Sequence, residues 1–291
     1  MINELDLKRK SVRIAQILIY FFFIFFSVSI FIPILLTLIV SFSSEMSVMQ
    51  KGYSFFPNGW SLDAYKYVFT ETDILQAYWV TIRVTVIGTT LSVFVNSMAG
   101  YAMSRKTLKY RNVLAFMLYF PSLLNPGVVA WYHNVKEVYK LTNTLWVLIL
   151  PNLVKMYDIF LIRNYYSTIP DSLEEAAKID GAGPFTIFTK IMFPLALPIT
   201  AMVTLTTSLG YWNDWYLASW FISSDHKELY PLQYHLYVLW QLLASKTNQT
   251  ETPQQTVYVA TMFVTMGPII LVYPFLQKYF MKGIMVGAVK G

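Results

Sequence analysis

Six segments of the sequence are almost entirely apolar, and each is long enough to cross a lipid bilayer as an α-helix. A helix rises about 1.5 Å per residue, so about 20 mainly apolar residues span a hydrocarbon core roughly 30 Å thick. The sequence therefore predicts an all-α integral membrane protein with six transmembrane helices. The expected spans are 14–42, 76–103, 112–131, 145–162, 195–222 and 256–280.

The composition excludes the other common classes of protein. Hydrophobic residues make up 56% of the chain and charged residues 13%, whereas a soluble domain has about 25% charged residues. This hydrophobicity excludes disorder, and the unbroken apolar runs do not fit the alternating strands of a membrane barrel. The chain has no cysteine, and its three histidines form no zinc-binding motif, so we expect no metal site.

The basic residues indicate how the spans are oriented. The net charge is +6, but Lys and Arg are dispersed between apolar runs rather than gathered on one element, so we expect no nucleic-acid partner. With the N-terminus in the cytoplasm, fourteen of the 22 basic residues lie inside, six outside and two within spans. This distribution follows the positive-inside rule. We therefore expect both termini in the cytoplasm and a single domain over 1–291.

Three loops between the expected spans are large enough to carry function. Two are external, 43–75 and 223–255, and one is cytoplasmic, 163–194. In the second external loop, leucines recur every three or four residues over Tyr230–Leu243, which predicts an interfacial helix too short to span the membrane.

The cytoplasmic loop predicts two short helices. Ser172 and Glu175 fit a capping box, and Gly181 stands where a helix C-terminus needs a residue with positive φ, so the first helix is expected over 173–180. A second helix is expected over 185–192, ended by Pro194.

The first helix has features of a docking element. Ala176 and Ala177 would let a partner approach its backbone, while Glu174, Glu175 and Asp180 offer charge to basic groups of that partner. An ordinary capped helix lying along the membrane is the alternative.

The spacing of this loop resembles a known motif. Glu175-Ala176-Ala177 is followed after three residues by Gly181, after nine more by Ile191, and then by Phe193-Pro194. This is similar to the EAA loop of ATP-binding-cassette (ABC) importer permeases, EAA-x3-G-x9-I-x-L-P, with Phe193 where leucine is usual. The resemblance implies that the short helix inserts into a cleft of an ATPase subunit and transmits its movement to the spans. The expected coupling residues are Glu174, Glu175, Ala176, Ala177, Asp180, Gly181 and Gly183.

Weaker similarities extend over nearly the whole chain and favour the carbohydrate-uptake branch, in particular the smaller permease of maltose-type systems and Gram-positive oligosaccharide permeases. They lie at Pro57–Tyr65, Asn143–Pro151, Ile169–Leu173, Trp212–Asp214 and Gly287–Gly291. The resemblance implies a bacterial plasma-membrane protein whose partners are a second homologous permease, two ABC ATPase subunits, an extracellular solute-binding protein and a carbohydrate. It also implies that the tail, with Lys290 and Gly291, contacts the ATPases. The chain has no phosphate-binding loop, so ATP and Mg²⁺ are expected on the ATPase subunits and no cofactor on this chain.

Charged residues within the spans are candidates for a substrate pathway. Arg83 and Asp214 lie at similar expected depths, so they would pair or line one water-filled vestibule, unless each reaches the headgroups separately. Lys155 and Asp158, three residues apart, are expected to form a surface pair near the interface.

Aromatic and polar residues surround Asp214. Sugar rings stack on aromatic faces and their hydroxyls need polar partners, so this run suits a carbohydrate, although an interfacial aromatic belt would give the same pattern. With Arg83, the expected pathway residues are Tyr211, Trp212, Asn213, Asp214 and Trp215. In the maltose-type systems that the chain resembles, the larger permease holds most of the sugar contacts.

The function predicted is therefore that of a permease subunit working by alternating access, with no catalysis of its own. A membrane enzyme using Asp158 and Asp214 is disfavoured, because they are expected near opposite membrane faces without a nucleophile and base. A permease for a non-sugar solute and a stand-alone secondary transporter remain alternatives; the latter usually has paired repeats.

Overall fold

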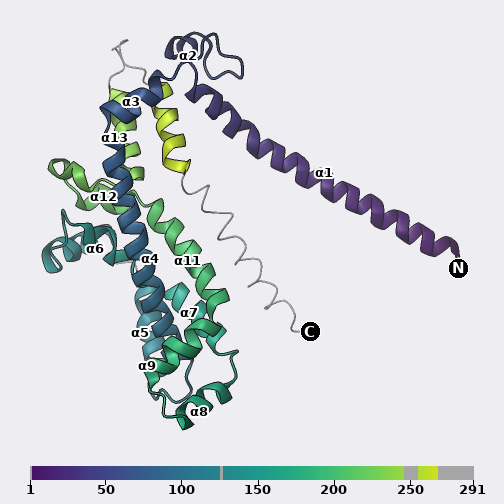
Figure 1. Cartoon of the computed structure of the whole chain (residues 1–291), viewed down its shortest axis with the longest axis vertical. Helices are drawn as coiled ribbons and strands as arrows, with labels where there is room; N and C mark the ends of the chain where they lie inside the picture. The colour runs from purple at the N-terminus through teal and green to yellow at the C-terminus, as the bar shows by residue number, and fades with distance from the viewer. Residues whose placement is uncertain (1, 125–126, 246–254, 268–291) are drawn as a thin grey trace. The chain divides into compact units, whose positions relative to one another are not determined.

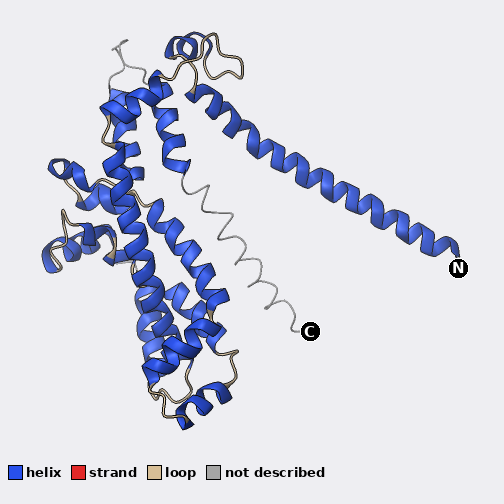
Figure 2. Ribbon diagram, in the orientation of Figure 1, coloured by secondary structure: helices blue, strands red, loops and turns tan. Residues whose placement is uncertain are grey.

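The computed structural model describes residues 2–124, 127–245 and 255–267, and nearly all of this part of the chain is helical (Figures 1 and 2). Its only strand-like pairing is an isolated antiparallel bridge between Ser43 and Trp60. The predicted all-α class is confirmed in these residues. The chain divides into two compact units, one from 1–72 and 240–264 and the other from 73–239 and 265–291.

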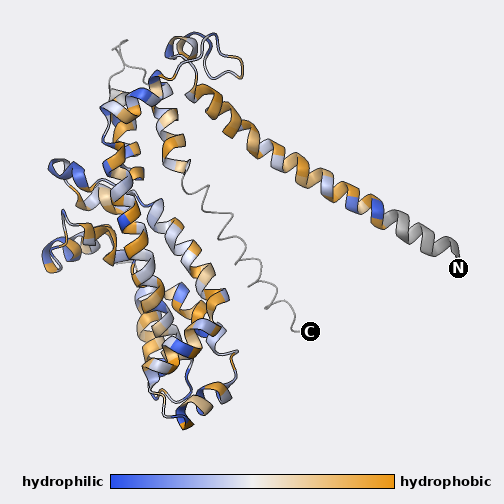
Figure 3. Ribbon diagram, in the orientation of Figure 1, coloured by the Kyte–Doolittle hydropathy of each residue, from blue (hydrophilic) through white to orange (hydrophobic). Residues whose placement is uncertain are grey.

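The first unit begins with the long helix α1 (Ile2–Ser41). Every side chain from Val12 to Leu35 is exposed, and the helix is strongly apolar (Figure 3). An apolar helix with no protein cover suits a lipid environment, where hydrocarbon takes the place of a protein core.

Two short helices follow α1, namely α2 (Glu45–Lys51) and α3 (Asp63–Glu71). The Glu45 carboxylate accepts hydrogen bonds from the backbone N–H groups of Gln255 and Thr256, at 3.0 and 2.9 Å. It thereby caps the positive end of the helix over 255–267. The expected last span, 256–280, is helical as far as 267, and its remainder lies outside the described residues.

The second unit is built around α4 (Ile74–Ser104), along which α7 (Met156–Tyr166) and α11 (Leu197–Trp212) pack (Figure 1). Glycines of α4 permit this close approach. A Cβ on Gly88 would lie 2.7 Å from Cζ of Tyr211 in α11, and one on Gly100 would lie 2.9 Å from Cγ2 of Ile162 in α7. Small residues at such contacts are typical of helix packing in membranes.

Shorter elements complete the second unit, and the last of these helices continues past residue 239 into residues of the first unit. They are α5 (Arg111–Leu123), α6 (Gly127–His133), a π-helical turn (Asn134–Val138), 3₁₀ turns (Leu145–Leu148, Leu150–Asn152 and Ser224–Leu229), α8 (Asp171–Ile179), α9 (Pro184–Ile187), a second π-helical turn (Phe188–Met192), α10 (Phe193–Leu195), α12 (Tyr216–Phe221) and α13 (Leu232–Ser245). The helix expected over Tyr230–Leu243 is confirmed by α13, which starts two residues later.

In the described residues, only Val12–Ser41 and Ile74–Ser104 are single helices long and apolar enough to cross a membrane. Three further spans would each be a bent pair: Arg111–Leu123 with Gly127–Val138, Leu145–Asn152 with Met156–Tyr166, and Pro184–Leu195 with Leu197–Trp212. The last two pairs bend by 50° and 82°. The expectation of continuous helices over 145–162 and 195–222 is therefore wrong, and the six-span topology stays a prediction.

A proline accounts for the bend before α11. Pro198 lies in the first turn of α11, where its ring would clash with the preceding turn and its missing N–H cannot bond the Pro194 carbonyl, so a straight helix through Ala196 is disfavoured. The bend before α7 falls at 153–155, after Pro151, and there Ser92 and Asn96 of α4 bond the Leu153 carbonyl.

Candidate coupling site and transport pathway

The helix α8 is the core of the predicted coupling loop. Its C-terminus has the expected geometry: Gly181 has φ of +80°, its N–H bonds the Lys178 carbonyl at 3.0 Å, and the Ala182 N–H bonds the Ala177 carbonyl at 2.9 Å. This pair of bonds is a Schellman motif, which satisfies carbonyls at the helix end. The predicted helix end at Gly181 is thus confirmed.

The N-terminus of α8 differs from the prediction. The helix begins at Asp171, with Pro170 as its cap residue and no side-chain capping bond, so the capping box of Ser172 and Glu175 is wrong. Ser172 already lies in the first helical turn, where its side chain is past the cap position. The second helix also differs, because it runs through Pro194 to Leu195 by way of the π-helical turn.

The inner face of α8 is fixed by a buried ion pair. Glu174 is 7% exposed, and its Oε2 lies 2.7 Å from Nη1 of Arg105, which follows the last residue of α4 and is 9% exposed. Arg105 also donates from Nη2 to the Tyr166 carbonyl, at 3.2 Å. Lys178 contacts Oε1 of Glu174 at 2.7 Å. One guanidinium group therefore joins α8 to the C-terminal ends of α4 and α7.

These contacts determine the protonation of Glu174. Burial by itself raises the pKa of Glu174. The hydrogen bond from Lys178 and the charge and hydrogen bond of Arg105 together lower it by more than burial raises it, so the pKa lies below its ordinary value of 4.5. Glu174 is therefore ionised at neutral pH and the ion pair is intact.

The outer face of α8 is open. Glu175, Ala176 and Asp180 are exposed, and the apolar side chain of Ile179 is 86% exposed. By contrast, Glu174 and Ala177 face inward, so the expectation that Glu174 offers its charge to a partner is wrong. The reason is that residues three apart share one face of a helix, and Arg105, 69 residues away in the chain, takes up this carboxylate. Gly183 precedes α9, as its N-terminal cap.

Asp214 and Arg83 are both in the second unit but do not pair. Asp214 accepts hydrogen bonds from Asn152 Nδ2 at 2.8 Å and from the Leu217 N–H at 3.1 Å. Arg83 instead donates to the Trp79 carbonyl at 3.4 Å. The pairing interpretation is therefore wrong, because the Asp214 carboxylate is bound instead by Asn152 and by an N–H in the first turn of α12, whose N-cap residue is Trp215. A shared vestibule stays a prediction.

The aromatic candidates separate into core and surface residues. Tyr211 is 2% exposed and donates to the Ile149 carbonyl at 3.0 Å, and Trp212 is buried and donates to the Thr265 carbonyl at 3.3 Å. Trp215 is 41% exposed and stacks on Tyr237, with ring centroids 4.9 Å apart. Asn213 is exposed. Among the aromatics proposed for the pathway, only Trp215 is thus exposed to a solute.

A polar core between the helices was missed from the sequence. Asp158 is 5% exposed and accepts from Thr207 Oγ1 at 3.2 Å, so the predicted surface pair with Lys155 is wrong. Ser92 and Asn96 of α4 donate to the Leu153 carbonyl at 2.7 and 3.2 Å. These two residues, four apart and therefore on one face of α4, are the sequence signal that marks the site. They bind a carbonyl exposed by the break before α7.

The remaining candidates fall elsewhere. Lys290 and Gly291 lie outside the described residues. Within the described part of the chain, no group of three or more His, Asp or Glu side chains is placed to hold a metal ion.

Comparison with known proteins places the chain in a family. The family described as binding-protein-dependent transport system inner membrane component matches residues 5–286. The chain belongs to this family. The predicted resemblance to ABC-importer permeases is thereby confirmed. The permease is a membrane subunit of a transport system that works with a binding protein and an ATPase.

Several relatives are similar over almost their whole length. The permease is 35% identical to the polygalacturonan/rhamnogalacturonan transport system permease protein YtcP of Bacillus subtilis, over 96% of this chain and 99% of that protein. It is 30% identical to the arabinooligosaccharides transport system permease protein AraQ of Halalkalibacterium halodurans, over 98% and 100%. Among solved structures, a chain of a bacterial ABC transporter that imports the acidic polysaccharide alginate matches with a TM-score of 0.82 and 28% identity, covering 93% of this chain and 98% of that one.

Proposed function

We propose that the permease imports a carbohydrate, in particular an oligosaccharide, across the bacterial plasma membrane. The printed functions of its relatives support this substrate class, since they include polygalacturonan or rhamnogalacturonan, arabinooligosaccharides and maltodextrin. A non-sugar substrate is the alternative. The proposed topology has six spans and both termini in the cytoplasm, in keeping with the distribution of basic residues.

The observation that carries the proposed mechanism is the two-sided character of α8. Its inner face is tied to α4 and α7 through Arg105 and Glu174, whereas Glu175, Ala176 and Ile179 are open on the outer face. A helix of nine residues is marginal by itself, so these contacts keep it formed before any partner binds. The outer face suits a cleft on an ATPase subunit, and the inner ion pair would pass its displacement to the spans.

The ion pair connects ATP binding to alternating access. Two ATPase subunits that close around ATP and Mg²⁺ would displace α8 and, through Arg105, the cytoplasmic ends of α4 and α7. ATP must bind the outward-open arrangement more tightly than the inward-open one, because a ligand shifts an equilibrium only by its difference in affinity. This chain has no phosphate-binding loop of its own. A second, homologous permease would complete the pathway, and the tail with Lys290 and Gly291 would contact the ATPases.

The substrate pathway would include the surface around Trp215 and Asn213. The exposed ring of Trp215, held against Tyr237, offers a face for stacking on a sugar, and the neighbouring Asn213 amide offers hydrogen bonds to hydroxyls. Arg83 and Asp214 would line the same vestibule without touching one another. Tyr211 and Trp212 would shape it from the core.

The test is uptake by the complete complex in proteoliposomes, with the solute-binding protein added and ATP enclosed. A panel of labelled neutral and uronic-acid oligosaccharides, an amino acid and a dipeptide would be compared. ATP-dependent uptake of at least one oligosaccharide, reduced in Trp215→Ala and retained in Trp215→Phe, is the expected result. Uptake of only the amino acid or the dipeptide would reject the carbohydrate proposal, and uptake by this chain alone without ATP would reject the ABC mechanism.

A further inference from the structure

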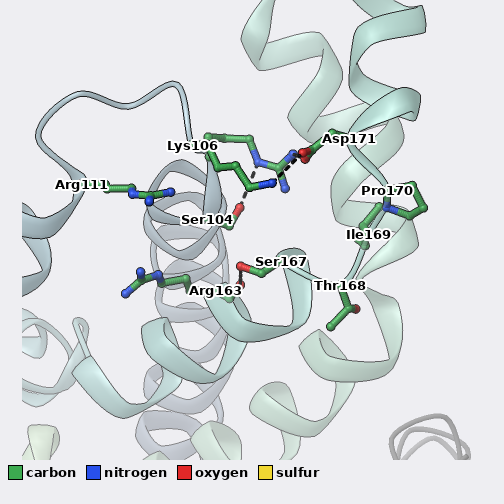
Figure 4. A pocket seen from close by; sticks show the side chains of 10 residues that line it. Ser104, Lys106, Arg111, Arg163, Ser167, Thr168, Ile169, Pro170 and Asp171 are labelled. Carbon is green, nitrogen blue, oxygen red and sulfur yellow. Dashed lines mark hydrogen bonds and ion pairs between the residues drawn. The ribbon is translucent and has the colours of Figure 1, made fainter. Parts of the chain in front are cut away.

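A basic pocket lies beside the coupling helix in the second unit. Its volume is about 340 Å³, and Figure 4 shows side chains that line it. The complete lining consists of Ser104, Arg105, Lys106, Arg111, Arg163, Ser167, Thr168, Ile169, Pro170 and Asp171. The lining therefore contains four cationic side chains and one carboxylate, and this excess of positive charge favours the binding of an anion.

Two of the four cations already have partners. Arg105 is neutralised by Glu174 at 2.7 Å, and Lys106 lies 3.4 Å from Asp171. Neither Arg111 nor Arg163 has a carboxylate within ion-pair distance among the described residues. Both are only half-buried. In Figure 4 their guanidinium groups lie on the side of the pocket away from Asp171. The pocket therefore retains two positive charges in a fork-shaped form that suits phosphate oxygens.

The positions of these two arginines indicate the depth of the site. Arg111 is the first residue of α5 and stands directly before the expected span 112–131. Arg163 stands directly after the expected span 145–162, in the last turns of α7. On the proposed topology, both lie where a span enters the cytoplasm, at the level of the lipid phosphates. Basic pockets between membrane helices on this side are suited to anionic headgroups.

The hydroxyl groups of the pocket restrict the headgroup further. Ser104, Ser167 and Thr168 donate their protons to backbone carbonyls, at 2.7, 3.0 and 2.8 Å. A hydroxyl whose proton is used in this way still offers lone pairs, so it accepts hydrogen bonds, although Ser104 already accepts one from Nε of Arg105 at 3.0 Å. A ligand with a phosphate for the arginines and hydroxyls for these acceptors fits the lining, and phosphatidylglycerol has both.

We propose that this basic pocket binds the headgroup of an anionic phospholipid of the cytoplasmic leaflet, with its phosphate held by Arg111 and Arg163. An acidic surface of a protein partner would meet the same charges, but the recessed shape and the depth at the ends of two spans favour the lipid. Pro170 and Asp171, at the start of α8, form part of the wall. A bound headgroup therefore contacts the segment that leads into the coupling helix.

The test is lipid retention by the complete complex, taken from nanodiscs of phosphatidylglycerol and phosphatidylcholine and measured by native mass spectrometry. The variant Arg111→Gln/Arg163→Gln should bind phosphatidylglycerol about 30-fold more weakly, because each basic group near a membrane surface contributes about a further fivefold. The control Lys109→Gln/Lys190→Gln removes the same charge from exposed residues outside the pocket and should retain the lipid like wild type. The single variant Arg111→Gln, with an intermediate loss, guards against misfolding of the double variant.

Four outcomes would overturn the proposal. Equal retention by all forms would show that the pocket is not a lipid site, and equal loss in the control would show a diffuse surface charge. Loss of the ATPase subunits from Arg111→Gln/Arg163→Gln with the lipid retained would assign the arginines to a protein contact. Displacement of the lipid by millimolar inorganic phosphate would assign the site to the free anion. Transport is not measured, so failure of the importer proposal would leave these results interpretable.

Discussion

Replacement of Arg105 by methionine tests the ion pair that holds α8. Methionine retains an unbranched side chain of similar reach but removes the charge that faces Glu174. Because both partners are buried, Arg105→Met leaves a carboxylate in a poorly solvated position. Removing one partner of a buried pair destabilises a protein by about 3–5 kcal/mol. Since Lys178 still contacts Glu174, the lower figure of about 3 kcal/mol applies, which is roughly a 100-fold change in the local opening equilibrium.

The assay is hydrogen exchange of the backbone amides of α8 in the assembled complex. Exchange over 171–182 should accelerate roughly 100-fold in Arg105→Met, while the core of α4 changes little. Lys106→Met is the matched control, because Lys106 pairs with Asp171 on the surface and such pairs contribute under about 1 kcal/mol. The double variant Arg105→Met/Glu174→Met should recover much of the protection, since it leaves no buried charge. Exchange in Arg105→Met no faster than in Lys106→Met would show that the Arg105–Glu174 pair does not hold α8 in place.

Three further predictions follow from the contacts described. Because the pKa of Glu174 in the folded chain lies below 4.5, its ion pair stabilises α8 fully above about pH 4.5 and is lost as the pH falls through the lower folded value. The protection factors of the α8 amides, which compare exchange in the folded chain with that of an unstructured peptide at the same pH, should therefore fall only in acid, and Glu174→Gln should abolish that dependence. Gly181→Ala should destabilise the end of α8 by about 1 kcal/mol, because alanine rarely adopts the positive φ of this position; no atom lies within 4 Å of the added Cβ, so no steric clash contributes. This variant should lower transport-linked ATP hydrolysis, and Gly181→Asn should lower it less, because asparagine tolerates a positive φ better. Asp214→Ala should destabilise the complex by about 1 kcal/mol, because it removes the acceptor for the Leu217 N–H in the first turn of α12, and should reduce uptake with assembly intact. Asp214→Asn retains an acceptor and should keep the stability; equal destabilisation by both variants would contradict this role of Asp214.

The sequence predicts helices better than it predicts their continuity. Apolar length alone places α1 and α4, because a long uninterrupted apolar run has no other stable form in a membrane. The broken helices depend on which prolines are accommodated and on whether a polar side chain binds the free N–H groups of a new helix start, as Asp214 does in the first turn of α12. Pro33, inside α1, leaves that helix unbroken, so proline position by itself does not decide.

Site prediction shows the same division between local and long-range information. The positive φ of Gly181 is readable because a Schellman ending involves neighbouring residues only. The inward direction of Glu174 and the burial of Asp158 depend on Arg105 and Thr207, which lie far away in the chain. A motif can therefore locate the coupling helix, whereas the division into inner and outer faces requires the packed structure.

The assignment of α8 as the coupling helix is tested by a photo-crosslink from its outer face in native membranes. A photoreactive phenylalanine analogue would replace Ile179, the most exposed apolar side chain of that helix. A control variant would carry the analogue in place of the exposed Trp60. We predict that position 179 crosslinks to an ABC ATPase subunit, that ATP changes the yield, and that position 60 does not reach the ATPase. Absence of the ATPase from the products at 179, with the complex otherwise assembled, would contradict the assignment of α8 as the coupling helix.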